Sequence, residues 1–182
     1  FTGAHQQKKG LIELSHRGSV FLDEIGEMSP GLQAKLLRFL ESKAFRRVGG
    51  MRDLTPDVRI IAATHRDLRD EVRAGRFRDD LFYRLSVLHV HLPPLRERRE
   101  DIEALVAHFV ERFDREFRKS VRSVSPSTMA RLESYPWPGN VRELRNAVER
   151  AVLLADSELL GDADFELLAD VAPSAAPASV PA

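Results

Sequence analysis

Two neighbouring acidic residues follow a short apolar run and carry the strongest chemical signal in the sequence. Val20-Phe21-Leu22 stops abruptly at Asp23-Glu24, a pattern typical of a buried parallel strand whose carboxyl end delivers polar groups to a site. Because adjacent side chains of a strand diverge, Asp23 could hold a magnesium ion while Glu24 orients an attacking water. The pattern predicts a Walker-B arrangement. For this segment alone, a strand that simply ends at a polar loop is the alternative.

Thr64 ends a second apolar run, which begins at Val58. In a parallel sheet the ends of adjacent strands lie side by side, where ligands collect. We therefore expect Thr64 to face a phosphate. The alternative is an ordinary threonine that caps the stretch beginning with His65.

A charged segment contains Arg78 and Arg84, with apolar residues between and beside them. Their spacing does not place them on one face of a regular helix, so both reach one ligand only if the helix breaks or the segment lies at a subunit edge. The alternative is a solvated helix in which Asp79 and Asp80 pair with the arginines.

The elements that must position these groups alternate between strand and helix. Ser29 as N-cap and Pro30 at the first helical position open a helix between the two apolar runs. Strand, helix and strand in that order predict a parallel α/β sheet. Inside this crossover, Phe45 to Val48 and the stretch around Leu54 flank Gly49-Gly50, which indicates a hairpin-like excursion.

Two further elements are expected before the sheet closes. A helical stretch runs from about Arg66 to Ala74, and Val87 to Leu92 has the pattern of another strand, which ends at Pro93-Pro94.

The second half of the chain has the periodicity of helices alone. One helical stripe begins after Glu100 and contains Ile102, Leu105, Val106, Phe109, Val110, Phe113 and Phe117. Ser125-Pro126 starts a second helix, and Asn140 is expected to N-cap a third, with Glu143 completing the cap. These helices predict a three-helix lid. After about Asp170 the composition collapses to Ala, Pro, Ser and Val, which is typical of a linker or disordered tail.

Composition narrows the function classes. The 28 basic and 28 acidic residues give a formal net charge of zero, so nothing global steers the chain to nucleic acid. No apolar run is long enough to cross a bilayer, and the absence of cysteine fits a reducing compartment. We expect a cytoplasmic protein without membrane contact. The start at Phe1 and the lack of a secretory leader suggest a piece of something longer.

Several motifs in order resemble one known family. The letters are FTGA, GSVFLDEIGEM, RRVGG, DVRIIAATH, GRFRDDLFYRL, HLPPLRERREDI and WPGNVRELRN. They are similar to the sigma-54-interacting AAA+ ATPase domain of bacterial enhancer-binding transcription activators of the nitrogen-regulator type, from Phe1 to roughly Leu168, and FTGA looks like the last four letters of the GAFTGA loop.

The resemblance implies a role for each matching residue. Asp23 would bind Mg²⁺ and Glu24 would polarise the hydrolytic water, while Thr64 occupies the first-sensor position. Arg78 and Arg84 match arginine fingers that serve the ATP of the adjacent subunit in a hexameric or heptameric ring.

The same resemblance assigns the remaining sites. Arg142 matches the second sensor, which contacts ATP from the lid. The residues Phe1, Thr2, Gly3 and Ala4 belong to the loop that presses on the sigma factor of the sigma-54 RNA polymerase holoenzyme. Arg46 to Asp53 would be a second pore loop.

The resemblance also fixes the expected organisation. The fold class is α/β, a partial AAA+ P-loop-type parallel sheet with flanking helices, followed by a C-terminal helical lid. Residues 1–98 would form the later part of the α/β core, 99–170 the lid, and 171–182 a tail. Any DNA contact would be made by a domain not present here.

The phosphate-binding loop of such ATPases is missing from these 182 residues. No lysine followed by serine or threonine is framed by glycines anywhere in the sequence. Because the backbone amides of that loop cradle the phosphates, we expect this piece alone neither to bind ATP tightly nor to hydrolyse it.

Three other interpretations remain open at this stage. Ser125 to Ala155 could be a helix-turn-helix module whose Arg142, Arg145 and Arg150 contact the DNA backbone. The whole chain could be a non-catalytic partner-binding module. His89 and His91 would share one face of a strand and could form a zinc pair, but without a third ligand nearby they are expected to be core or surface histidines.

Overall fold

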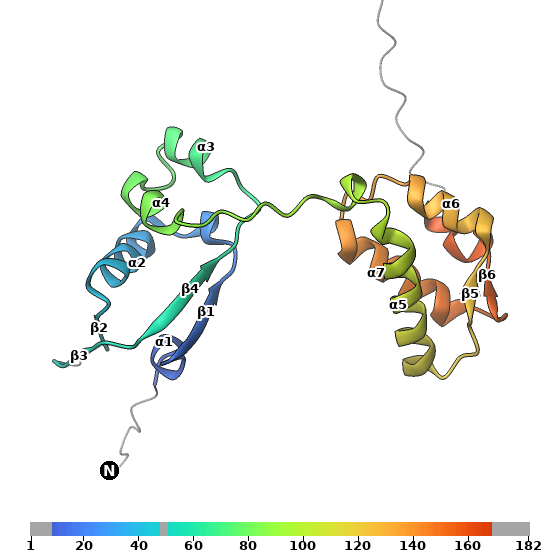
Figure 1. Ribbon diagram of the computed structural model, residues 1–182, viewed down its shortest axis with the longest axis horizontal. Coiled ribbons are helices and arrows are strands. Elements are labelled where there is room, and N and C mark those ends of the chain that lie inside the picture. Colours follow the sequence, from blue (N-terminus) through green and yellow to red (C-terminus); the bar gives the residue numbers. More distant parts are fainter. Residues whose placement is uncertain (1–8, 48–50, 169–182) are drawn as a thin grey trace, which may run out of the picture. The chain divides into compact units, whose positions relative to one another are not determined.

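The computed structural model describes residues 9–47 and 51–168. The chain divides into two compact units, Phe1–Val90 and His91–Ala182 (Figure 1). Within the described residues, no helix has the length and apolar character that a membrane crossing requires.

The first unit is built on two parallel strands. β1 (Gly18–Leu22) pairs with β4 (Val58–Ala62), and Leu22 stands opposite Ala62. The long helix α2 (Pro30–Ser42) lies between them in sequence, so the predicted strand, helix and strand with parallel pairing is confirmed. A parallel pair brings the carboxyl ends of both strands to one edge, and this edge carries the candidate site.

The expected hairpin-like excursion is also present. After α2, which a left-handed Lys43 terminates, β2 (Phe45–Arg46) pairs antiparallel with β3 (Asp53–Leu54). The guanidinium of Arg46 donates to the carboxylate of Asp53 at the end of the hairpin nearest the connecting loop. Val48 to Gly50, in the middle of the expected second pore loop, lie outside the described residues.

Helices cover one face of the two strands. The short helices α1 (Leu11–Leu14), η1 (Ile25–Glu27), α3 (Leu68–Arg73) and α4 (Asp79–Leu85) complete the unit. The core residues are Ile25, Leu36, Phe39, Leu40, Phe77 and Leu81, with Leu22, Val58 and Ile60 packed against them. On the opposite face, Phe21 and Ile61 remain 61% and 41% exposed.

The expected strand from Val87 to Leu92 is wrong. The chain there has no regular structure, and Val87, Leu88, Val90 and Leu92 are all strongly exposed. A strand forms only where a neighbour completes its backbone hydrogen bonds. The described part of the chain offers no such neighbour to this stretch, so its apolar pattern alone does not make it a strand.

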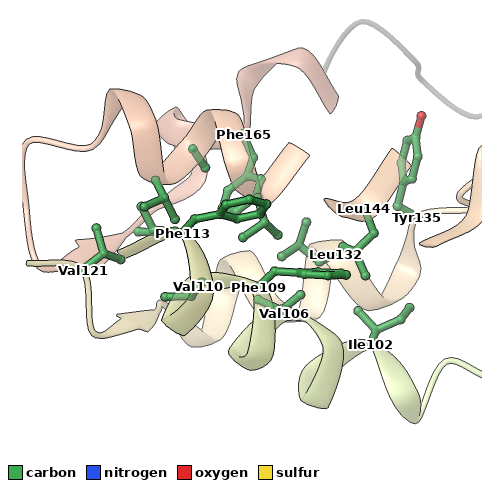
Figure 2. Close-up of a cluster of buried hydrophobic side chains, with 14 of the residues drawn as sticks. Ile102, Val106, Phe109, Val110, Phe113, Val121, Leu132, Tyr135, Leu144 and Phe165 are labelled. Atoms are coloured by element: carbon green, nitrogen blue, oxygen red, sulfur yellow. The ribbon is translucent and has the colours of Figure 1, made fainter. Parts of the chain in front are cut away.

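The second unit contains the three predicted helices. They are α5 (Asp101–Phe117), α6 (Pro126–Ser134) and α7 (Asn140–Leu154), and η2 (Leu95–Glu97) precedes them. Figure 2 shows the apolar stripe of α5, with Ile102, Val106, Phe109 and Phe113 turned into the core. A small parallel pair was not predicted: β5 (Ser123–Val124) and β6 (Leu159–Leu160), followed by η3 (Asp162–Leu168).

The predicted capping role of Asn140 is wrong. Gly139 holds the N-cap position of α7, and Asn140 has a left-handed φ of 52°. The Asn140 Oδ1 instead accepts a hydrogen bond of 2.8 Å from the Leu95 amide, while the Glu143 carboxylate accepts one of 2.8 Å from the Gly139 amide. Asparagine tolerates the left-handed region, so the same side chain that could cap a helix ties the α7 turn to η2.

Candidate functional site

The two acids lie at the carboxyl end of β1, at the edge where β4 also ends. The Ala63 amide donates to Leu22 O at 2.9 Å, and the Ile25 amide donates to Ala63 O at 3.0 Å. The chain therefore stays beside β4 as it passes through Asp23 and Glu24. Both acidic side chains are exposed, so both can meet a ligand from solvent.

Glu24 adopts a backbone conformation that is unusual for a residue other than glycine. Its φ of 51° and ψ of 44° are left-handed, and its amide donates to Asp23 Oδ1 at 3.0 Å. The Glu24 carboxylate lies 2.6 Å from His65 Nδ1. Strained backbone of this kind clusters at functional sites. His65, which follows the end of β4, thus holds the carboxylate of Glu24. No signal in the sequence indicates this contact.

Thr64 lies against the turn that follows the acids. A Cβ placed on Gly26 would come within 2.8 Å of Thr64 Oγ1, so the absence of a side chain at Gly26 lets the two strand ends approach. The Thr64 hydroxyl accepts a hydrogen bond of 3.1 Å from the Arg66 amide. Thr64 therefore lies at the same sheet edge as the acids, and it also caps the stretch that begins with His65.

A buried carboxylate organises the charged residues behind this edge. Glu71 is 7% exposed and accepts two hydrogen bonds from Arg76, of 2.7 and 2.8 Å, and one of 3.2 Å from Arg66. Hydrogen bonding from Arg76, assisted by Arg66, lowers the pKa of Glu71 to about 2. Arg66 also pairs with Glu27 of η1. In sequence this looks like an ordinary solvated charge run, so the network was missed.

Residues 76–85, the arginine segment, show features of both sequence interpretations, the subunit-edge arginines and the solvated helix with paired arginines. Arg78 lies just before α4 in extended conformation, so it is not part of the helix that carries Arg84. Its guanidinium donates to both carboxylate oxygens of Asp80, at 3.0 and 2.6 Å, and this raises the pKa of Arg78. Arg84 donates to Leu40 O of α2 at 3.2 Å. In the single chain each arginine has an internal partner.

One further buried polar group touches the arginine segment. Gln33 of α2 is 1% exposed and makes three hydrogen bonds to backbone groups. Its Nε2 donates to Met28 O at 2.8 Å and Arg76 O at 3.0 Å, and its Oε1 accepts from the Arg78 amide at 2.9 Å. A lone glutamine in a helix gives no sequence signal of such contacts.

The second unit carries the remaining predicted cation. Arg142 is exposed in the first turn of α7 and makes no hydrogen bond or ion pair within the described part of the chain. Arg145, one of the alternative DNA contacts, pairs with Glu149. The residues Phe1, Thr2, Gly3 and Ala4 lie outside the described residues.

The histidine pair finds no support as a zinc site. His89 and His91 are exposed and do not lie on a strand. Among residues 9–47 and 51–168, no group of three or more His, Cys, Asp or Glu side chains is placed to hold a metal ion. Asp23 is not excluded by this criterion, because Mg²⁺ in nucleotide sites is held by one or two carboxylates together with substrate phosphates.

Comparison with known families covers nearly the whole chain. The sigma-54 interaction domain matches residues 1–91, and the AAA+ ATPase lid domain matches residues 96–179. These matches confirm the family resemblance and the α/β fold class with a helical lid.

Individual relatives agree with the family matches. The chain is 50% identical to the Nif-specific regulatory protein of Herbaspirillum seropedicae over 91% of its own length and 30% of the relative. It is 49% identical to the regulatory protein AtoC of Escherichia coli, over 91% of this chain and 36% of that protein. The chain thus spans about a third of the length of these relatives.

A solved structure shows the same fold. NtrX from Brucella abortus in complex with ATP aligns with a TM-score of 0.84 and 40% identity, over 94% of this chain and 40% of that chain. With a parallel strand pair that ends in adjacent acids, a three-helix second unit and these matches, the chain belongs to the sigma-54 interaction family of AAA+ ATPase domains.

Proposed function

We propose that this chain is part of the ATPase module of a sigma-54-dependent transcription activator, which couples ATP hydrolysis to remodelling of the sigma-54 RNA polymerase closed complex. The observation that carries the proposal is the adjacency of Asp23, Glu24 and Thr64 at the shared edge of β1 and β4, in a chain of this family. The protein would act in the cytoplasm, and any DNA contact would come from a domain outside these residues.

Asp23 is the proposed magnesium ligand. Its carboxylate is exposed, and oxygen is the ligand type that Mg²⁺ requires. The residues present therefore fit one protein ligand, with phosphates and water as the others. Bound MgATP would supply the transferable phosphoryl group and the charge of the metal.

Glu24 is the proposed residue that orients the attacking water. Phosphoryl transfer needs little covalent help from the protein, so the placement of water and cations does most of the work. The carboxylate of Glu24 is held at 2.6 Å by His65, which fixes its position relative to the end of β4. Thr64, at the same edge, would sense the phosphate.

Arg78 and Arg84 are the proposed arginine fingers for the nucleotide of an adjacent protomer in a hexameric or heptameric ring. Both guanidinium groups now have internal partners, Asp80 and the Leu40 carbonyl, which they would exchange for phosphate oxygens. An arginine finger contributes about three to five powers of ten in rate. Arg142 would contact ATP from the lid.

The phosphate-binding loop and the sigma-factor contact complete the proposal. The 182 residues contain no glycine-framed Lys-Ser or Lys-Thr, so we propose that they neither bind ATP tightly nor hydrolyse it without a loop supplied from elsewhere. Phe1, Thr2, Gly3 and Ala4 would press on the sigma factor and transmit the movement.

Substituting Glu24 by glutamine in a longer form of the protein that includes a phosphate-binding loop tests the catalytic role. We expect ATP turnover to fall at least a hundredfold, while nucleotide binding, measured by calorimetry, changes little. Unchanged turnover would favour the non-catalytic partner-binding module. A parallel titration of the 182-residue chain tests the missing loop, and micromolar ATP binding by that chain would contradict the proposal.

A further inference from the structure

Few polar side chains of the described residues are buried, and two of them meet at the arginine segment. The buried polar or charged residues are Gln33, Glu71 and Thr128. Burying a polar group costs free energy unless its hydrogen bonds are made. Gln33 and Glu71 each make hydrogen bonds to Arg76, and Gln33 also bonds to the Arg78 amide.

The Gln33 amide joins the turn that follows the two acids, residues 25–28 (the acid turn), to the arginine segment. Its two donated bonds go to the carbonyls of Met28, just after η1, and of Arg76, and its accepted bond comes from the Arg78 amide. The orientation of the amide follows from its partners, because a flipped amide would face donors with a donor and acceptors with an acceptor. All three partners are backbone groups, so these hydrogen bonds fix the main chain at Met28, Arg76 and Arg78 relative to α2.

Glu71 holds the same stretch through a second set of hydrogen bonds. The amides of Arg76 and Phe77 donate to Glu71 O at 2.9 and 3.1 Å, and the Glu71 carboxylate binds the Arg76 guanidinium. The Phe77 side chain is 3% exposed in the core. The Arg78 side chain, which is 47% exposed, therefore extends from a backbone that these hydrogen bonds hold.

We propose that Gln33 is a positioning residue for Arg78, whose backbone it fixes relative to the acid turn of its own protomer so that the guanidinium reaches the nucleotide of the next. The inference rests on the proposed function, because it needs Arg78 to act across a protomer boundary. A purely structural Gln33 would stabilise the first unit and nothing more.

Mixed rings of a longer form of the protein that includes a phosphate-binding loop separate these two roles. One protomer carries Gln33→Met, which keeps the side-chain length but removes all three hydrogen bonds, and the other carries Glu24→Gln. Each homogeneous ring should lose at least tenfold in ATP turnover. In a random equal mixture, about a quarter of the head-to-tail interfaces combine an intact Glu24 with a correctly held Arg78. Turnover should recover well above either homogeneous ring.

Two controls make the result specific. Lys35→Met, an exposed substitution on the same helix, should leave turnover unchanged. A mixture of Arg78→Ala with Glu24→Gln should recover in the same way. If it does not, the trans role of Arg78 fails and the proposal with it. If this control recovers and the Gln33→Met mixture does not, the positioning role is overturned while the proposed function stands.

A second variant separates the positioning role from a general loss of stability. Gln33→Glu keeps the acceptor for the Arg78 amide but sets an acidic oxygen against two carbonyls. We expect it to be less stable than Gln33→Met but to retain more turnover per assembled ring, because the bond to Arg78 survives. A turnover that simply follows the stability order of the two variants would contradict the positioning role.

Discussion

Glu71 is a buried charged residue that stabilises the first unit. Its carboxylate accepts hydrogen bonds from both Arg76 and Arg66, and these bonds lower its pKa from the ordinary value of 4.5 to about 2. Because the folded pKa is below the unfolded one, the stabilisation is fully present above about pH 4.5 and is lost as the pH falls towards 2. Glu71→Gln should therefore unfold at lower denaturant concentration at pH 7 and show a weaker loss of stability on acidification.

The measurement is urea unfolding of the 182-residue chain by circular dichroism at several pH values between 7 and 3. Asp57→Asn is the matched control, since this exposed side chain makes no hydrogen bond or ion pair in the described residues. If wild type and Glu71→Gln lose stability in parallel as the pH falls, the ion-pair network does not contribute as stated.

The close approach of Gly26 to Thr64 leads to a second prediction about single residues. An added methyl group would lie 2.8 Å from Thr64 Oγ1, and threonine is too short and stiff to move its hydroxyl away freely. Gly26→Ala should cost about 1–3 kcal/mol, as overpacking does. In the Thr64→Ala background the same change should cost clearly less. Additive costs in this double-mutant cycle, measured by urea unfolding, would show that the contact is not the cause.

Some positions in the candidate site could be predicted from the sequence and others could not. Asp23, Glu24 and Thr64 were placed correctly at one sheet edge because strand ends are marked by where an apolar run stops. His65 and Gln33 were missed because their contacts depend on how distant backbone segments meet. Arg78 is an intermediate case, because its pairing with an aspartate was one of two alternatives that the sequence left open.

At the scale of elements, periodicity predicted most helices and strands but not every end. The stripes of α5 and α7 exceed three turns and stand out, and β1 and β4 are short apolar runs with clear stops. The prediction of a strand at 87–92 was wrong because a strand needs a neighbouring strand, and the sequence of the stretch itself does not show whether one is present. β5 and β6 are two residues each, too short for any period to appear.

Helix α7 provides the prediction that belongs to this scale. Leu144 is 0% exposed and packs in the core of the second unit, whereas Leu154 on the same helix is 65% exposed. Leu144→Ala should destabilise the unit by about 2–5 kcal/mol, and Leu154→Ala should stay within about 0.5 kcal/mol. The one tryptophan, Trp137, is buried in this unit, so its fluorescence reports the transition. Equal effects of the two substitutions would contradict the described packing.

At the scale of the whole molecule, the chain is two compact units with separate hydrophobic cores. Such units can unfold separately, so a single free energy of unfolding need not describe the chain. The residues proposed to meet the nucleotide are divided between the two units. The acids lie in one unit and Arg142 in the other, while a phosphate-binding loop is missing from the sequence altogether.

The open face of the first unit leads to the last prediction. Phe21 and Ile61 stand opposite each other on β1 and β4 and are 61% and 41% exposed. Exposed apolar sheet surface favours association, so the 182-residue chain should self-associate with rising concentration in sedimentation velocity. The double substitution Phe21→Thr and Ile61→Thr should weaken this, because threonine keeps strand propensity without the apolar surface. Leu11→Thr removes an 81% exposed leucine outside the strands and should have a smaller effect. Association that is equally sensitive to Leu11→Thr would mean that this sheet face is not the contact.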